Sequence, residues 1–296
     1  MNTMPEMTET PGAPEVTLLT KADYRSPNKP TWCVGCGDYA VLDAITRALA
    51  SLQVDPDKLA VVSGIGCSSR LPVFLRAYGF HSVHGRVLPV ATGVKLANPE
   101  LVVLAVGGDG DGLAIGASHF VHAARRNINV TYVMMDNSIY GLTKGQTSPT
   151  SKLEAVTGTS PYGNLEPPID PVTLSLAAGA TFVARGFASK VEDMANLIRA
   201  GIEHDGFAFI HAISPCVTFN NTFKALAPLI TGLPEDHDPT NRTQAVARAV
   251  VENRIYAGLF YQDKTSVSFG ELVRKNVARR FPRASSDFAE VLEQFR

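Results

Sequence analysis

The four cysteines of the chain have the number and the spacing of a metal-ligand set. Cys33 and Cys36 form a C-x-x-C pair, whereas Cys67 and Cys216 stand alone, each after an apolar run. Four thiolates can hold a cubane iron–sulfur cluster or a tetrahedral zinc ion. Zinc ribbons usually contain two close pairs, and a catalytic dithiol would leave two of these cysteines unexplained. We therefore favour a redox cluster and keep zinc as the alternative.

A second set of polar residues lies between the third and the fourth cysteine. A Gly-Asp-Gly turn around Asp109 follows the apolar run 101–106, and Asn137 follows the apolar run 130–136. In a parallel sheet both runs would end at the same edge, where phosphates bind at helix N-termini. Glycine lets the backbone approach a diphosphate, and carboxylate and amide oxygens suit Mg²⁺. The pattern predicts a magnesium–diphosphate site beside the cysteines.

The composition argues against several classes of protein. Apolar residues make up 45% of the 296-residue chain, and its formal net charge is −1. This balance gives no indication of nucleic acid or of an anionic membrane as a partner. The sequence shows no signal peptide and no apolar run long enough to span a membrane, so the cytoplasm is the expected compartment. Cysteines there serve as metal ligands or redox thiols more often than as disulfides.

Alternation of short apolar runs with helical patterns predicts an α/β fold, with a mostly parallel sheet flanked by helices. We expect residues 1–30 to form an extended arm, 31–225 the cofactor-binding domain, and 226–296 a helical extension without strands. The segment 141–168 is expected to be a long functional loop. The expected strands are 59–63, 101–106, 130–136, 181–184 and 207–212, and the expected helices are 38–52, 112–126, 171–178, 191–204, 242–252, 269–279 and 285–295.

Nine short segments follow one another within roughly residues 25–225. They are 32–38 (WCVGCGD), 64–70 (GIGCSSR), 84–86 (HGR), 91–99 (ATGVKLANP), 107–110 (GGDG), 136–137 (DN), 140–146 (YGLTKGQ), 148–150 (SPT) and 214–216 (SPC). Together they resemble the β subunit of 2-oxoacid:ferredoxin oxidoreductases, most closely the 2-oxoglutarate branch. Val34 and Ser69 depart from the pattern, since many relatives carry Pro and Gly there. The ends of the chain beyond these segments look less typical of the family.

The resemblance implies a thiamine-diphosphate-binding domain of the diphosphate type. It implies Mg²⁺ on Asp109, Asn137 and the backbone of Ile139. It also implies a [4Fe-4S] cluster on all four cysteines: Cys33, Cys36, Cys67 and Cys216. The residues expected to bind thiamine diphosphate are Gly66, Cys67, Ser68, His84, Gly85, Gly108, Asp109, Gly110, Asp111, Asn137, Ile139, Gly141, Leu142 and Thr143.

The activity that the resemblance implies is oxidative decarboxylation of a 2-oxoacid with coenzyme A as co-substrate and ferredoxin as electron acceptor. Thiamine enzymes also need a carboxylate beside the aminopyrimidine. In this superfamily that glutamate lies on a separate pyrimidine-binding domain, and the sequence contains a single diphosphate-type domain. We therefore expect an α subunit to supply the glutamate, in an αβ heterodimer or a dimer of heterodimers. The chain alone should be inactive.

Three residues are candidates for catalysis and substrate contact. Arg70 follows the ligand Cys67 closely, and a guanidinium pairs well with a second carboxylate such as that of 2-oxoglutarate. Lys144 is another candidate for this contact, and His84 could touch the diphosphate or the substrate. The alternative for Arg70 and Lys144 is a solvated surface charge or a counter-ion of the diphosphate, and for His84 a histidine of the core.

Other functions stay open at this level. A preference for pyruvate or a branched-chain 2-oxoacid would use the same machinery. A pure electron-transfer protein would keep the cluster and lose the thiamine site, and a zinc-stabilised nucleotide-binding module would have no redox chemistry. Intact Asp109 and Asn137 argue against the electron-transfer alternative.

Overall fold

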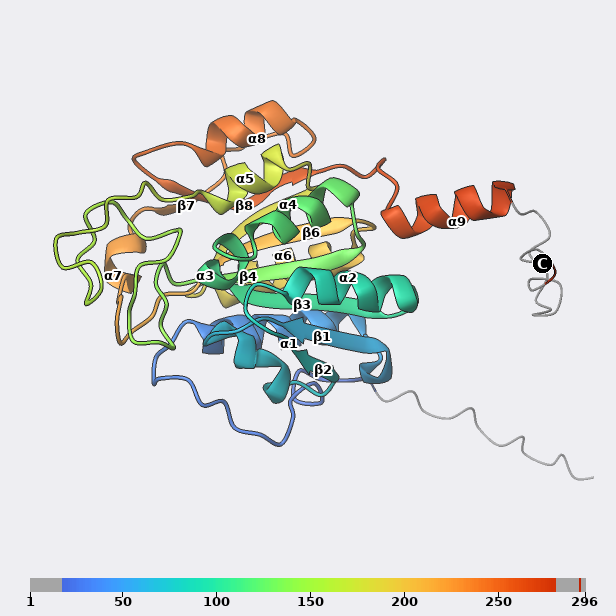
Figure 1. Cartoon of the computed structure of the whole chain (residues 1–296), viewed down its shortest axis with the longest axis horizontal. Helices are drawn as coiled ribbons and strands as arrows, with labels where there is room; N and C mark the ends of the chain where they lie inside the picture. Colours follow the sequence, from blue (N-terminus) through green and yellow to red (C-terminus); the bar gives the residue numbers. More distant parts are fainter. Residues whose placement is uncertain (1–17, 281–292, 294–296) are drawn as a thin grey trace, which may run out of the picture.

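The computed structural model describes residues 18–280 and residue 293, and an eight-stranded sheet forms its centre (Figure 1). The strands are β1 (Leu59–Ser63), β2 (Tyr78–His81), β3 (Val102–Gly108), β4 (Val130–Asp136), β5 (Phe182–Phe187), β6 (Phe207–Ile213), β7 (Ile230–Gly232) and β8 (Ile255–Gln262). Their order across the sheet is β2-β1-β3-β4-β6-β5-β8-β7. The pairs from β2 to β5 are parallel, and β8 runs antiparallel to β5.

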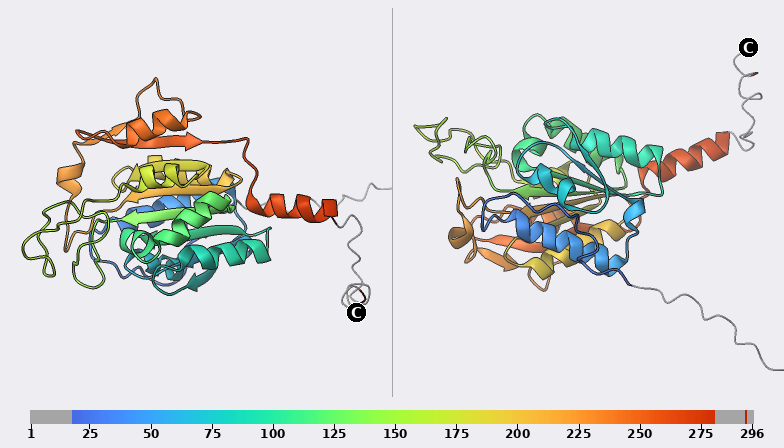
Figure 2. Two further views of the ribbon diagram at one scale, coloured as in Figure 1. Left: turned by 45° about the horizontal axis from the view of Figure 1, so that its top comes forward. Right: turned by 90° about the horizontal axis from the view of Figure 1, so that it is seen from below.

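Helices cover both faces of the sheet, as the two views of Figure 2 show. Alternate residues along each central strand point to opposite faces, so one apolar core forms on each side. Helices α1 (Asp38–Leu52) and α6 (Val191–Glu203) pack on one core. The other core is covered by α2 (Val87–Ala97), α4 (Ala117–Arg126), α5 (Pro171–Ala177) and α8 (Arg242–Ala249). The remaining helical segments are α3 (Asp109–Leu113), α7 (Phe223–Leu226), α9 (Phe269–Arg280), η1 (Pro56–Lys58) and η2 (Ser68–Phe74).

The predicted α/β sheet with flanking helices is confirmed, and the five expected strands are present as β1, β3, β4, β5 and β6. Strands β1, β4 and β6 are buried along their whole length, which is why each appears in the sequence as an unbroken apolar run. The expected loop is also present. Residues 137–170 contain no helix or strand and lie together at one side of the molecule (yellow-green in Figure 1).

The prediction that residues 226–296 contain no strand is wrong. Strand β8 pairs with β5 and so extends the central sheet, and β7 pairs with β8. The side chain of Phe260 in β8 is fully buried, so this segment contributes to the core. The expected helix 242–252 ends earlier, at Ala249, and the expected helix 269–279 is α9. The expected helix 285–295 lies outside the described residues except for residue 293.

The two ends of the described chain differ in how they meet the body. Residues 1–17 of the expected arm lie outside the described part. The following stretch is anchored by Tyr24, which is fully buried and donates its hydroxyl to the Val54 carbonyl at 2.7 Å. Helix α9 buries none of its described side chains and projects from the body in both views of Figure 2. Within residues 18–280 and 293, no helix combines the length and the apolar character needed to cross a membrane.

Candidate functional site

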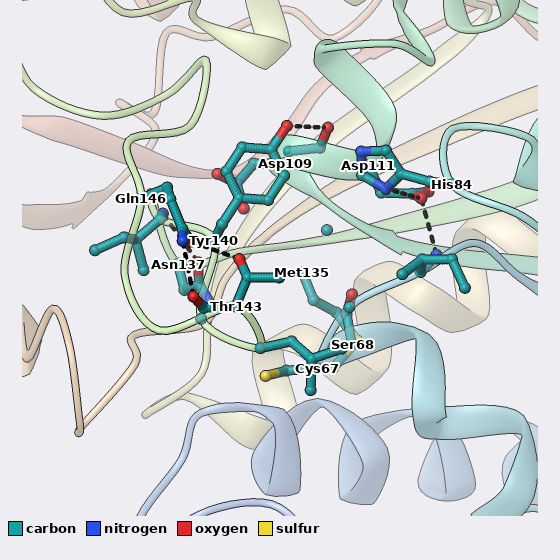
Figure 3. Close-up of a pocket in the computed structure, with 17 residues that line it drawn as sticks. Cys67, Ser68, His84, Asp109, Asp111, Met135, Asn137, Tyr140, Thr143 and Gln146 are labelled. Carbon is teal, nitrogen blue, oxygen red and sulfur yellow. Dashed lines mark hydrogen bonds and ion pairs between the residues drawn. The ribbon is translucent and has the colours of Figure 1, made fainter. Parts of the chain in front are cut away.

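One cavity of about 460 Å³ opens at the carboxyl ends of β1, β3 and β4 (Figure 3). Thirteen of the fourteen residues predicted to bind thiamine diphosphate line it, and Gly85 is the exception. The backbone N–H of Gly85 instead donates to Asp111, which does line the cavity. Four further lining residues were not among those predicted: Ile65, Met135, Tyr140 and Gln146. The sheet edge thus gathers the predicted residues in one place, and their binding roles stay predictions.

Asp109 and Asp136 are two buried carboxyl groups that share one hydroxyl. Thr150 Oγ1 lies 2.9 Å from Asp109 Oδ2 and 2.8 Å from Asp136 Oδ1, but a hydroxyl has one hydrogen to donate. Burial and the neighbouring Asp136 raise the pKa of Asp109 to about 8. Burial would also raise the pKa of Asp136, but the interaction with His211 and the hydrogen bonds from Thr150 and Ser138 together outweigh burial, so the pKa is lowered. At neutral pH Asp109 therefore keeps a proton for Thr150, and Thr150 donates to Asp136.

Asn137 is presented to the cavity by a tight turn that follows β4. Ser138 adopts left-handed backbone dihedrals with φ 57°, and its N–H donates to Asp136 Oδ1 at 2.8 Å. The Asn137 Oδ1 atom accepts the N–H of Ile139 at 3.0 Å. Asn220 Nδ2 donates to the Asn137 carbonyl at 2.9 Å, so the turn is also held from the segment after β6. These bonds place the Asn137 side chain and the Ile139 backbone at the cavity wall.

Asp111 ties three segments of the site together. Its Oδ1 accepts the N–H groups of Ile65 and Gly85, each at 2.8 Å, and lies 3.2 Å from His84 Nδ1. Its Oδ2 is buried without a hydrogen-bond partner within the described structure. Burial raises the pKa of Asp111, although the two backbone N–H groups and His84 oppose that rise. Figure 3 shows the His84 ring against Asp111 at the cavity wall, so this carboxyl group orients the imidazole.

The cysteine side chains approach the same cavity. Cys67 lines it, and a Cβ atom placed on Gly141 would lie 3.5 Å from Cys67 Sγ and 3.8 Å from Cys216 Sγ. The same point lies 3.5 Å from Asn137 Nδ2. Only a glycine at position 141 leaves this space between the thiols and Asn137 open. The N–H of Phe219 donates to Cys216 Sγ at 3.4 Å, which is a suitable bond for a metal-bound sulfur.

One buried acidic group, Asp38, acts on two of these thiols. Burial, together with Asp38, raises the pKa of Cys36, and burial, Asp38 and Cys216 raise that of Cys67 to about 11. Asp38 is itself fully buried, and burial raises its pKa to about 6 although Ser214 Oγ donates to it at 2.6 Å. The thiols of Cys36 and Cys67 are therefore protonated at neutral pH in the described structure, and all four cysteines are free of disulfide bonds. A cation in their midst would make their ionisation favourable.

The two metal assignments stay predictions. Within residues 18–280 and 293, no group of three or more His, Cys, Asp or Glu side chains has an arrangement that could hold a metal ion. Cys33 lies on an exposed loop, and its C-x-x-C turn is closed by a bond from Cys36 N to Cys33 O at 3.0 Å.

The structure separates the three candidate catalytic residues. His84 lines the main cavity, whereas Arg70 and Lys144 do not. Arg70 lines a different cavity of about 420 Å³, together with Lys29 and His81. Lys144 is exposed and adopts a positive φ of 78° at the tip of the turn that carries Gly141.

Comparison with known proteins covers nearly all of the described chain. Residues 64–212 match the family described as thiamine pyrophosphate enzyme, C-terminal TPP binding domain. Residues 216–276 match the family described as the C-terminal part of the pyruvate ferredoxin oxidoreductase beta subunit. The second match corrects the expectation that the C-terminal part is untypical, because it extends the resemblance well beyond residue 225.

Individual relatives agree with these family matches. A 2-oxoacid:ferredoxin oxidoreductase β subunit of Aeropyrum pernix is 43% identical and covers 86% of each chain. The 2-oxoglutarate oxidoreductase subunit KorB of Mycobacterium tuberculosis is 46% identical over 75% of this chain and 60% of its own. Among solved structures, a 2-oxoglutarate:ferredoxin oxidoreductase from Magnetococcus marinus with 2-oxoglutarate, coenzyme A and succinyl-CoA bound superimposes with a TM-score of 0.90. Its sequence identity is 42%, over 94% of this chain and 96% of that one.

Asp111 gives a direct test of this site geometry. A Cβ atom at Gly64 would overlap Asp111 Oδ2, so Gly64→Ala must displace the carboxyl group from the Ile65 and Gly85 N–H groups. We expect the free energy of unfolding to fall by about 1–3 kcal/mol, the usual cost of leaving buried polar groups unpaired. Hydrogen exchange at these two amides should also become faster.

The matched control is Gly93→Ala in helix α2, because a Cβ there meets nothing within 4 Å. It should be neutral or slightly stabilising, since alanine favours a helix more than glycine does. If Gly64→Ala matched this control in thermal unfolding and in exchange, the proposed role of Asp111 in joining the segments would be wrong.

Proposed function

Because the chain belongs to the β subunits of the 2-oxoacid:ferredoxin oxidoreductase family, we propose that it is the thiamine-binding half of a 2-oxoglutarate:ferredoxin oxidoreductase. The enzyme would convert 2-oxoglutarate and coenzyme A to succinyl-CoA and carbon dioxide, and two electrons would pass to ferredoxin. The observation that carries the proposal is the shared edge at which Asp109, Asn137 and Cys67 line one cavity. Free thiols are typical of a reducing compartment, so we propose the cytoplasm as its location.

The magnesium–diphosphate part of the proposal fits the residues present. Asp109 is a buried carboxyl group with a raised pKa, and a cation beside it would replace the proton that it otherwise keeps. Asn137 Oδ1 and the Ile139 carbonyl would complete the protein ligands of Mg²⁺. Thiamine diphosphate, when bound, supplies a nucleophilic carbon and an electron sink for the decarboxylation.

Other residues of the cavity position and shield the reactants. A Cβ at Gly110 would overlap the Tyr140 ring, so the glycine allows the loop to close over the start of α3. Tyr140 donates its hydroxyl to the Gly110 carbonyl at 3.0 Å and holds that closure. Met135 and Leu142 add apolar surface that excludes water. His84 turns Nδ1 toward Asp111, which leaves Nε2 for a substrate or a diphosphate oxygen.

We assign the [4Fe-4S] cluster to the four cysteines. The support is the raised pKa of Cys36 and Cys67, whose ionisation a nearby cation would favour, and the place of Cys67 in both the thiol set and the cavity wall. An electron carrier held there would border the reacting substrate. Zinc would satisfy the thiols equally well but has no redox chemistry, so it would serve this reaction less well.

An α subunit is needed to complete the site. None of the 17 residues of the described chain that line the cavity is a glutamate. The carboxylate that activates the aminopyrimidine would therefore come from the partner, which would also cover the exposed apolar side chains of the loop 137–170, such as Val156 and Tyr162. Turnover by the β chain without a second polypeptide would contradict this assignment.

The proposed function is tested on the co-purified complex by iron, sulfide and thiamine analysis, followed by turnover of several 2-oxoacids with ferredoxin. We expect both cofactors on the complex and the highest kcat/KM for 2-oxoglutarate. A preference for pyruvate or a branched-chain 2-oxoacid would support the alternative within the family.

Magnesium affinity should depend on pH through Asp109. Its pKa of about 8 lies above neutrality, and a metal binds only the ionised carboxylate. As the pH increases toward 8, the apparent affinity for Mg²⁺ should therefore rise by up to about tenfold per pH unit. Above pH 8 the affinity should level off, because Asp109 is then already ionised. Calorimetric titration of the complex with Mg²⁺–thiamine diphosphate measures this dependence.

The control for this titration is Asp109→Asn, which keeps the shape of the side chain but cannot titrate. Its weaker binding should retain only the pH dependence of the diphosphate itself. Equal pH slopes in the two proteins would show that Asp109 is not the group exchanged for the metal.

Loss of a single thiol should remove the cluster. Cys67→Ser is expected to abolish most of the bound iron and sulfide and the broad visible absorption, because four thiolates are required. Val34→Ala, an exposed position inside the C-x-x-C turn, should keep them. A Cys67→Ser protein with the full iron content would exclude this cysteine as a ligand.

Arg70 is the proposed partner of the second carboxylate of 2-oxoglutarate. Arg70 lines the neighbouring cavity, so a contact with 2-oxoglutarate would require its side chain to turn toward the main cavity. Arg70→Met should raise KM for 2-oxoglutarate by about 10- to 100-fold, the range of a lost charge-assisted pair, and leave KM for pyruvate nearly unchanged. Arg76→Met, an exposed neighbour, is the control in the same steady-state assay. Equal changes for both substrates would assign Arg70 another role.

A further inference from the structure

A row of charged and polar side chains crosses the sheet behind the proposed metal site. It begins with Arg185 in β5, continues through His211 in β6 and Asp136 at the end of β4, and reaches Thr150 in the loop 137–170. Each of these four side chains belongs to a residue that is at most 8% exposed. Arg185 and His211 are direct partners in the β5–β6 register, so the row follows the strands laterally.

The hydrogen bonds of the row fix one tautomer of His211. Arg185 Nε donates to His211 Nδ1 at 3.1 Å, so that ring nitrogen must be the acceptor. The ring hydrogen therefore sits on Nε2, which lies 2.8 Å from Asp136 Oδ2 and donates to it. With Oδ2 occupied in this way, Asp136 turns Oδ1 toward Thr150 and toward the N–H of Ser138.

Arg185 is held in turn from two sides. Its Nη2 pairs with Asp170, the residue that caps helix α5 and ends the loop 137–170. Its guanidinium carbon lies 5.3 Å from the centre of the Phe260 ring in β8, close enough for a cation–π contact. The row thus holds the loop at two points, at Thr150 and at Asp170.

We propose that Arg185 and His211 are positioning residues for the magnesium–diphosphate site. Neither side chain lines the main cavity, and their effect passes through Asp136 to the turn that presents Asn137 and to the Thr150 hydroxyl beside Asp109. The inference rests on the proposed function, since Asp109, Asn137 and Ile139 are the ligands to be positioned. Residues of this kind typically alter metal affinity by about 10- to 100-fold when they are replaced.

Two conservative variants of His211 separate the two halves of its role. Asparagine can accept from Arg185 at the position of Nδ1 but is too short to reach Asp136. Glutamine reaches Asp136 and can still accept from Arg185. In the αβ complex we expect His211→Asn to raise the dissociation constant of Mg²⁺–thiamine diphosphate by about tenfold or more, and His211→Gln to stay within about threefold of the unaltered protein.

The matched control is His204→Asn. His204 is also buried, and its Nε2 lies 2.7 Å from Thr181 Oγ1, at the start of the strands and away from the site. This variant loses a comparable buried bond, so its melting temperature should fall while its cofactor affinity is unchanged. In His211→Asn alone, hydrogen exchange should become faster at Ser138 and Ile139, and saturating cofactor should restore kcat.

Each outcome decides the question. If the unaltered complex binds no Mg²⁺–thiamine diphosphate, the proposed function fails. If it binds and folded His211→Asn binds equally well, the positioning role is excluded. Should His211→Asn not assemble, Arg185→Lys replaces it, because lysine keeps the charge for Asp170 but lacks a donor fixed at Nε. Weaker cofactor binding by that variant supports the role, and unchanged binding excludes it.

Discussion

The site depends on the cost of keeping two carboxyl groups close together and away from water. Asp109 follows β3 and Asp136 ends the adjacent parallel strand β4, so the fold brings them to one hydroxyl, that of Thr150. Two negative charges at such a distance in a medium of low dielectric repel strongly. A proton on Asp109 and a hydrogen bond donated by His211 to Asp136 reduce this repulsion. In the proposed function, a divalent cation would replace this proton and balance the two carboxylate charges.

The same sheet edge brings sulfur next to this oxygen site. Cys67 follows β1 and Cys216 follows β6, and the turn at Gly141 passes between their sulfurs and Asn137. A larger residue at position 141 would fill that space. The loop 137–170 therefore serves both halves of the proposed chemistry. It carries Asn137 and Gly141 at its start, and the Arg185–Asp170 pair secures its end.

Much of the site could be predicted because it lies where apolar runs end. Asp109 and Asn137 follow buried strands, and parallel strands end at a common edge.

The row behind them could not be predicted, because Arg185 and His211 meet only through the lateral register of β5 and β6. The orientation of Arg70 was missed for a local reason, since η2 begins at Ser68 and turns it toward another cavity. Strand β2 was not predicted because it is short and exposed, so its residues do not form a buried apolar run. Strand β8 is rich in aromatic residues and could have been recognised, but Gly258 interrupts its pattern.

Through the antiparallel strand β8, the C-terminal part of the chain influences a site that it does not line. Phe260 supports the guanidinium of Arg185, which orients His211 and, through it, the carboxyl group beside Asn137. This part of the polypeptide cannot be treated as an interchangeable module. A shortened isoform that ended before Ile255 would lose the edge of the sheet and the aromatic platform together. Because β8 pairs with β5 and Phe260 is fully buried, the first effect of such a loss would be a less stable fold.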